Sequence, residues 1–238
     1  MHIQKISLLT ALVLLFSTGF AQKSRSSDSR EEAGGDKMVQ MYRTMYETGM
    51  KYNDMAIATQ ATYALLALEP ENTKRLDTLA QIYFQRSAFA QAILVSSDVL
   101  KREPTNQGML EVRAFSKQSL GAAKEALADY EFLHSLSDDP YHLYEIATLQ
   151  YAMRRFGECE NSITKLLGSE KIKGKTISLS YNQIQQTVAF DAALHNLYGV
   201  IMLDQGKADV ARKHFEKAVE IAPEFYLAKA NIESMDKK

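Results

Sequence analysis

The stretch GVIMLDQGKADVARKHFEKAVEIAP, residues 199–223, decides the fold. Gly199 and Ala211 stand twelve residues apart in it, with Gly206 between them. Because residues three and four apart share one face of an α-helix, the apolar residues on either side of Gly206 predict two amphipathic helices in antiparallel contact. The small residues then mark where the two helices cross. Pro223 cannot continue the second helix and ends the unit.

The same pairing of small residues recurs earlier in the chain. The earlier pairs are Ala80 with Ala92, Ala114 with Ala126, and Ala147 with Cys159. The first three pairs begin 34 and then 33 residues apart, and the fourth follows after 52, which is one 34-residue period plus 18 extra residues. A period of this length is typical of stacked helical hairpins.

These residues resemble the tetratricopeptide repeat (TPR) family. Its pattern has a small residue in the first helix, a glycine in the turn, then alanine, an aromatic residue, alanine and a closing proline. The last unit matches it with Gly199, Gly206, Ala211, Phe215, Ala218 and Pro223. Pro70 and Pro104 keep the same register, whereas Asp138 and Lys171 replace the proline in two units. The resemblance implies an all-α fold, a right-handed superhelical array of antiparallel helix pairs called a TPR solenoid.

The register divides the TPR domain, residues 38–238, into units. We expect them at about 38–72, 73–106, 107–139, 140–173 and 192–225, with a C-terminal capping helix over 224–236. The first unit is the poorest match, because Tyr46 stands twelve residues before Ala58, where a small residue is expected. We interpret it as a degenerate repeat that caps the array, with helices over 39–49 and 52–68.

The extra residues form an insertion at about 171–190. Ile177 and Leu179 alternate with small polar residues, and a second β-prone stretch runs through Val188 to Phe190. Alternation of this kind predicts a short β-hairpin near 175–190. Two interpretations stay open: the insertion lengthens a connection between helices, or it projects from one face and shapes a binding groove.

The N-terminal segment has the pattern of an export signal. Lys5 precedes an apolar run over residues 6–16, and Gly19 and Ala21 are small residues where a signal peptidase would look for them. We expect a signal peptide over 1–21, a flexible linker over 22–37, and no membrane span after cleavage, since the run is shorter than the roughly 20 residues a span needs. A retained anchor is the alternative. The expected location is the periplasm of a Gram-negative envelope, with secretion as the alternative.

The sequence gives no sign of catalytic, metal-binding or nucleic-acid chemistry. A net charge of −1 argues against a nucleic-acid-binding surface. No metalloprotease, phosphate-loop or nucleophile-elbow motif occurs. The histidines of the mature chain, His134, His142, His195 and His214, are assigned to different units and helix faces. We therefore expect no enzyme, metal or cofactor, and we expect Cys159 to be a small buried residue.

The inner surface of the array is the expected binding site. In the TPR family the first helix of each unit lines this concave face. Placing the helices by their crossing residues assigns partner contacts to Phe84, Phe115, Tyr141, Tyr144, Tyr151 and Asn196. Tyrosine is suited to this role because it offers a wide contact area together with a hydroxyl group.

The leading hypothesis is an exported scaffold or adaptor that binds a protein or peptide on this concave face and helps to assemble a cell-envelope complex. Two alternatives belong to other classes. One is a structural module that self-associates. The other is an enzyme accessory subunit with a site at the 171–190 insertion, which a deep polar pocket with convergent titratable groups would favour.

Overall fold

The computed structural model describes residues 34–181 and 184–237. The described residues form two compact units, which divide between Ile82 and Tyr83. The expected signal peptide and most of the expected linker lie outside the described residues. Within the described part of the chain, no helix combines the length and apolar character needed to cross a membrane.

The first unit contains a helix over residues 34–51, then α2 (Met55–Leu68) and most of α3 (Thr73–Gln85). Residues 34–37, which we assigned to the flexible linker, lie inside the first helix. The physical reason is that extending an existing helix costs little free energy compared with nucleating one. The helix that forms after residue 38 therefore extends backwards over residues 34–37.

Gly49 lies where the first helix of the first unit comes close to the backbone at the start of α2. A Cβ atom built on Gly49 would lie 2.8 Å from the backbone nitrogen of Ala58 and 3.0 Å from the carbonyl oxygen of Asp54. Gly49 is buried, and Ala58 is fully buried. The first hairpin therefore has its small residue at Gly49 and not at the position of Tyr46, where the repeat register placed it.

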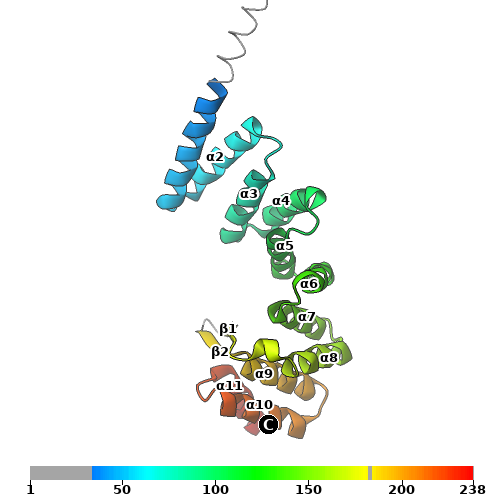
Figure 1. Ribbon diagram of the computed structural model, residues 1–238. Helices are drawn as coiled ribbons and strands as arrows, with labels where there is room; N and C mark the ends of the chain where they lie inside the picture. Colours follow the sequence, from blue (N-terminus) through cyan, green and yellow to red (C-terminus); the bar gives the residue numbers. More distant parts are fainter. Residues whose placement is uncertain (1–33, 182–183, 238) are drawn as a thin grey trace, which may run out of the picture. The chain divides into compact units, whose positions relative to one another are not determined.

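The second unit is a succession of helices, each packed on the next (Figure 1). After the end of α3 they are α4 (Phe89–Arg102), α5 (Gln107–Ser119), α6 (Ala123–Ser137), α7 (Pro140–Ala152), α8 (Phe156–Leu167), α9 (Phe190–Asp204), α10 (Ala208–Ile221) and α11 (Tyr226–Asp236). A 3₁₀ turn, η1 (Glu170–Ile172), follows α8. The predicted all-α architecture of consecutive helix pairs is confirmed.

One backbone feature marks the turn inside every helix pair. Asn53, Ser87, Gly121, Arg154 and Gly206 all have positive φ angles, between 55° and 79°. Their separations of 34, 34, 33 and 52 residues reproduce the repeat period and its one stretched interval. A left-handed residue reverses the chain tightly after a helix, and glycine adopts this conformation without a steric cost.

Small residues are fully buried at the predicted crossings of the second unit. Ala114 and Ala126 have no exposed surface, and neither have Ala147 and Cys159. The Cys159 thiol donates a hydrogen bond to the carbonyl oxygen of Ala147 at 3.0 Å. Burial raises the pKa of this thiol to about 12. Cys159 is therefore a small core residue, as expected.

The insertion is the predicted β-hairpin. Strands β1 (Thr176–Tyr181) and β2 (Ile184–Ala189) are antiparallel, with Thr176 opposite Ala189 and Tyr181 opposite Ile184. Phe190, which we placed in the second strand segment, instead begins α9. Its ring is fully buried, because the chain turns into the helix at this residue.

The hairpin rests on the C-terminal helices. Val188 is buried and lies opposite Ile177. The Gln186 side chain donates from Nε2 to the carbonyl oxygen of Glu224 and accepts from the backbone N–H of Tyr226 at 2.9 Å. A two-stranded hairpin is marginal by itself, so this contact with the turn between α10 and α11 supplies the backing that it needs.

The crossing of α9 and α10 leads to a stability prediction. A Cβ on Gly199 would lie 2.6 Å from Cε1 of the fully buried Phe215 ring. Gly199→Ala should therefore lower the free energy of unfolding by about 1–3 kcal/mol, because the ring must be displaced in a packed core. Chemical denaturation followed by circular dichroism measures the effect.

Gly157→Ala is the matched control. Gly157 lies in α8, and apart from its own helix no atom of residues 34–181 and 184–237 lies within 4 Å of the place that a Cβ on it would take. Alanine favours a helix over glycine by about 1 kcal/mol, so this variant should be at least as stable as the parent. Equal stability of Gly199→Ala and the parent would contradict the packing described for Phe215.

Candidate functional site

An open groove of about 310 Å³ lies within the second unit. We call it the aromatic groove. It is lined by Phe84, Glu111, Val112, Phe115, Tyr130, Tyr141, His142 and Glu145. These residues come from the end of α3 and from α5, α6 and α7, so the helix hairpins themselves bring them together.

One wall of the groove is a cluster of phenylalanine rings. Phe84 and Phe115 meet edge to face with ring centroids 5.3 Å apart. Phe89 lies 6.3 Å from Phe84 and 6.1 Å from Phe115. Rings in such contacts hold one another in place, yet Phe115 remains 45% exposed. The groove thus has a preformed apolar wall.

Tyr141 also lines the groove and is held from several sides. Its backbone N–H donates to the Asp139 carboxylate at 2.9 Å, which caps the start of α7. Its ring lies 5.1 Å from the Phe190 ring, and its hydroxyl donates to the carbonyl oxygen of Thr176 at 2.8 Å. The Lys175 ammonium lies 5.0 Å from the ring centroid. The hairpin therefore fixes the position of a groove residue.

A chain of polar side chains forms the floor. The Tyr130 hydroxyl donates to Oε1 of Gln118 at 3.2 Å, and Nε2 of Gln118 donates to Oε2 of Glu145 at 3.1 Å. Burial raises the pKa of Glu145, and it also raises the pKa of Tyr130. The Glu145 carboxylate is thus held in position in partly desolvated surroundings.

A second carboxylate lies at the mouth of the groove. Nε2 of the buried His142 ring is 3.1 Å from Oε1 of Glu111, and its Nδ1 is 3.1 Å from the Ser137 hydroxyl. Glu111 itself is exposed. This contact links α5 to α7 across the groove.

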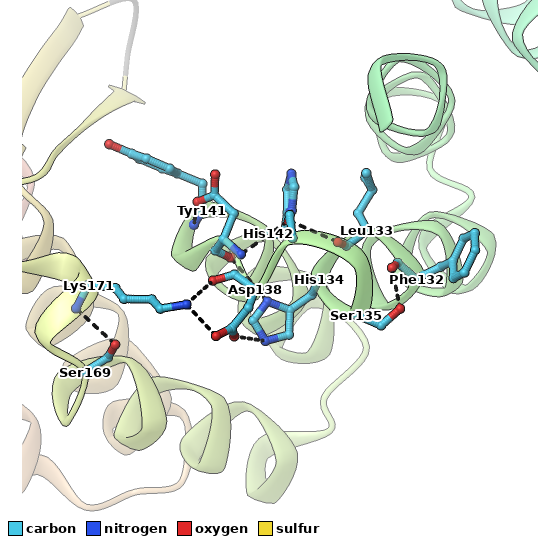
Figure 2. A network of polar contacts seen from close by, with 11 residues as sticks. Phe132, Leu133, His134, Ser135, Asp138, Tyr141, His142, Ser169 and Lys171 are labelled. Atoms are coloured by element: carbon cyan, nitrogen blue, oxygen red, sulfur yellow. Dashed lines mark hydrogen bonds and ion pairs between the residues drawn. The ribbon is translucent and has the colours of Figure 1, made fainter. Parts of the chain in front are cut away.

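An ion pair joins the two positions that lack the repeat proline. Lys171 Nζ lies 2.5 Å from Oδ2 of Asp138 and 3.3 Å from its carbonyl oxygen (Figure 2). This hydrogen bond lowers the pKa of Asp138 below its ordinary value. Asp138 ends α6 in the left-handed conformation. The ion pair therefore connects the end of α6 to the start of the insertion, close to Tyr141.

Comparison with known proteins bears on the fold. No protein-family model matches the sequence, and no curated protein matches it. Similar solved structures include a MamA protein, with 15% identity, a TM-score of 0.62 and coverage of 77% of this chain and 91% of that one. MamA from Desulfovibrio magneticus RS-1, from residue 41 to its end, has 13% identity, a TM-score of 0.63 and coverage of 79% and 97%. YrrB, described as a TPR protein with an unusual peptide-binding site, has 14% identity, a TM-score of 0.63 and coverage of 80% and 89%.

This chain has the TPR fold. At these identities the likeness establishes the architecture alone. It agrees with the helix pairs, the left-handed turn residues and the buried crossings described above.

Three of the six predicted site residues meet in the aromatic groove of this TPR array. Phe84, Phe115 and Tyr141 all line it. They come from three different helices, as expected for residues on the first helices of successive repeats.

Two of the six are covered by other parts of the chain, which corrects their assignment. Tyr144 is only 7% exposed and packs on Phe190 at a centroid distance of 5.6 Å. Asn196 is 5% exposed, and its Oδ1 accepts from Nδ2 of Asn231 at 2.9 Å. The reason is that the start of α9 and the C-terminal helix bring Phe190 and Asn231 over faces that the repeat register alone leaves open.

Tyr151 lies outside the aromatic groove. Its hydroxyl donates to Asp204 at 2.9 Å, and its ring lies 6.2 Å from the Phe156 ring. Burial, with the Asp204 carboxylate, raises the pKa of Tyr151 to about 12. The side chain thus links α7 to the end of α9, and its hydroxyl is already occupied.

Tyr130, His142 and Glu145 also line the groove, although the repeat register does not single them out. A signal for Glu145 was present. It stands four residues after Tyr141 in the same predicted helix, and residues at this spacing share a helix face. Tyr130 belongs to the second helix of its repeat, so the first-helix rule could not find it.

A second, open pocket of about 640 Å³ lies at the base of the insertion. Its lining includes the charged or titratable residues Glu170, Lys173, Lys175, Asp191, His195 and Lys217. Lys173 and Glu170 form an exposed ion pair at 2.5 Å. Over residues 34–181 and 184–237, no three His, Cys, Asp or Glu side chains group closely enough to hold a metal ion.

His195 and His214 form a pair, which corrects their assignment to different units and faces. Their Nδ1 atoms are 3.0 Å apart, between α9 and α10 of one repeat. The Tyr198 ring stacks on His214 at 4.3 Å. Burial lowers the pKa of both histidines, and the neighbouring His195 charge lowers that of His214 further. The contact is therefore made by neutral rings, one donating and one accepting.

This pair predicts a pH-dependent stability. Since both folded-state pKa values lie below the ordinary 6.5, the unfolded chain takes up protons first as the pH falls. The contribution of the pair is full above about pH 6.5 and is lost as the pH falls below it. Denaturation midpoints measured from about pH 8 to about pH 5.5 should fall more steeply for the parent than for His214→Gln. Parallel curves would contradict the assignment.

Proposed function

We propose that this chain is an exported scaffold whose aromatic groove binds a segment of a partner protein. The single observation that carries the proposal is the groove itself, in which Phe84, Phe115 and Tyr141 present ring surface around one opening. Aromatic side chains are enriched in protein interfaces, and tyrosine is among the residues enriched at their energetic centres.

The size of the groove fits a peptide segment. Its volume of about 310 Å³ lies at the lower end of the range for ligand pockets, about 300–1,000 Å³. Such a volume receives a few side chains and excludes a folded domain. A peptide-binding site is ascribed to YrrB, and this supports the same use of the fold here.

Export is the second part of the proposal. It rests on the apolar run over residues 6–16 followed by Gly19 and Ala21. In the periplasm, or outside the cell if the chain is secreted, the scaffold would help to assemble a complex of the envelope.

Self-association is a second candidate function. The first unit exposes large apolar side chains, Met38, Met41, Tyr52 and Tyr63, and Tyr52 is 70% exposed. Exposed apolar surface of this kind is typical of contact surfaces. A mass measurement in solution that finds only monomer across the micromolar range would exclude it.

The groove proposal predicts which aromatic residue matters. Phe115→Ala in the mature chain should lose the partner captured from the native envelope, with an affinity loss of about 2 kcal/mol, or about thirtyfold. Phe132→Ala is the matched control, since Phe132 is 41% exposed on α6 and does not line the groove. Equal capture by parent and Phe115→Ala would contradict the assignment.

Export predicts a specific mature terminus. Protein recovered from the periplasm of an expressing Gram-negative host should begin at Gln22, as read by N-terminal sequencing or intact mass. A chain that keeps Met1 and stays in the cytoplasm would contradict export and leave the groove proposal unaffected.

A further inference from the structure

The carboxylates that line the aromatic groove give it negative charge. Its lining residues include two carboxylates, Glu111 and Glu145, and neither lysine nor arginine. The other titratable side chains that line it are Tyr130, Tyr141 and His142. Of these, the His142 ring contacts Glu111 directly. The groove therefore presents negative charge beside its aromatic wall.

The basic residues of α5 pair with a carboxylate outside the groove, and Lys175 lies against the ring of Tyr141. Arg113 donates to the buried Asp129 carboxylate from Nε at 2.9 Å and from Nη2 at 2.7 Å. Lys117 Nζ donates to the same carboxylate at 2.7 Å. The Lys175 ammonium lies over the Tyr141 ring and is not among the lining residues. The two α5 cations therefore hold α6 and do not neutralise the carboxylates of the groove.

Glu145 is fixed in place by hydrogen bonds to neutral side chains. Its Oε2 accepts from Gln118 and lies 3.5 Å from the Thr148 hydroxyl. Burial raises the pKa of this carboxyl, because these two hydrogen bonds and the nearby His142 ring offset its desolvation only in part. A cationic group in the groove would supply the missing compensation.

We propose that the groove selects segments in which a lysine or arginine adjoins an aromatic or other apolar side chain, with Glu145 and Glu111 receiving the cation. The inference rests on the proposed function, since it names the chemistry of the segment that the groove binds. The apolar stem of a lysine or arginine packs along the rings of Phe115 and Tyr141, and its charged head reaches the carboxylates. An acidic segment would bring further negative charge to these two carboxylates.

The test uses three series of synthetic peptides and the mature full chain. The peptides share their length and their phenylalanine and leucine positions, and they differ only in carrying lysine, glutamine or glutamate at the polar positions. Fluorescence anisotropy measures their binding. The lysine series should bind about tenfold more tightly than the glutamine series, as expected for one charge-assisted hydrogen bond, and the glutamate series more weakly still.

Two variants separate specific from general charge effects. Glu145→Gln should weaken the lysine series about tenfold and leave the glutamine series unchanged. Glu216→Gln, on an exposed position of α10 outside the groove, changes the net charge equally and should have no effect. Circular dichroism confirms that both variants are folded.

Each contrary outcome has a distinct meaning. Binding of the glutamate or glutamine series as tightly as the lysine series would overturn the inference while leaving the groove as a binding site. Equal weakening by Glu216→Gln would overturn it too. Failure of every series to bind the parent, or a dimer that Phe115→Ala dissolves, would overturn the proposed function along with it.

Discussion

Each helix pair depends on the close approach of two backbones at a point where neither helix carries a large side chain. The distance between packed helices is set by the side chains at their contact, so alanine, glycine or cysteine at the crossing lets the pair close. In the second unit this point is marked by Ala114 with Ala126 and by Cys159 bonded to Ala147. At α9 the missing Cβ of Gly199 instead leaves room for the Phe215 ring of α10. These crossings bring together the helices that carry the groove residues.

The periodic part of the fold could be predicted from the sequence because it repeats. Each recurrence of the pair of small residues supports the same prediction of a helix pair. The left-handed turn residues of the structure recur at a matching spacing. Contacts that occur only once in the array were harder to predict. Gly49 closes the first hairpin outside the register, and the His195–His214 pair joins two residues that no motif connects. Such contacts depend on the rotation of individual helices, which spacing alone does not determine.

Part of the candidate site could also be predicted from the sequence. Periodicity placed Phe84, Phe115 and Tyr141 on the inner face, and they line one groove. It placed Tyr144 and Asn196 there as well, but Phe190 at the start of α9 covers the first and Asn231 of α11 covers the second. Glu145, in contrast, is a groove residue that the sequence analysis did not single out. Helix spacing puts Glu145 on the face of Tyr141, but its importance lies in a half-buried position beside Gln118 that only the assembled helices create.

The hairpin insertion affects how the binding surface of such a protein can change by mutation during evolution. It departs after α8 and returns at α9, and the repeat period resumes at Gly199 as though nothing had intervened. Yet its Thr176 carbonyl holds the Tyr141 hydroxyl at the wall of the groove. The hairpin residues that hold Tyr141 therefore occupy a different stretch of chain from the residues at the helix crossings. Mutation can alter the hairpin, and with it the wall at Tyr141, without touching one helix crossing.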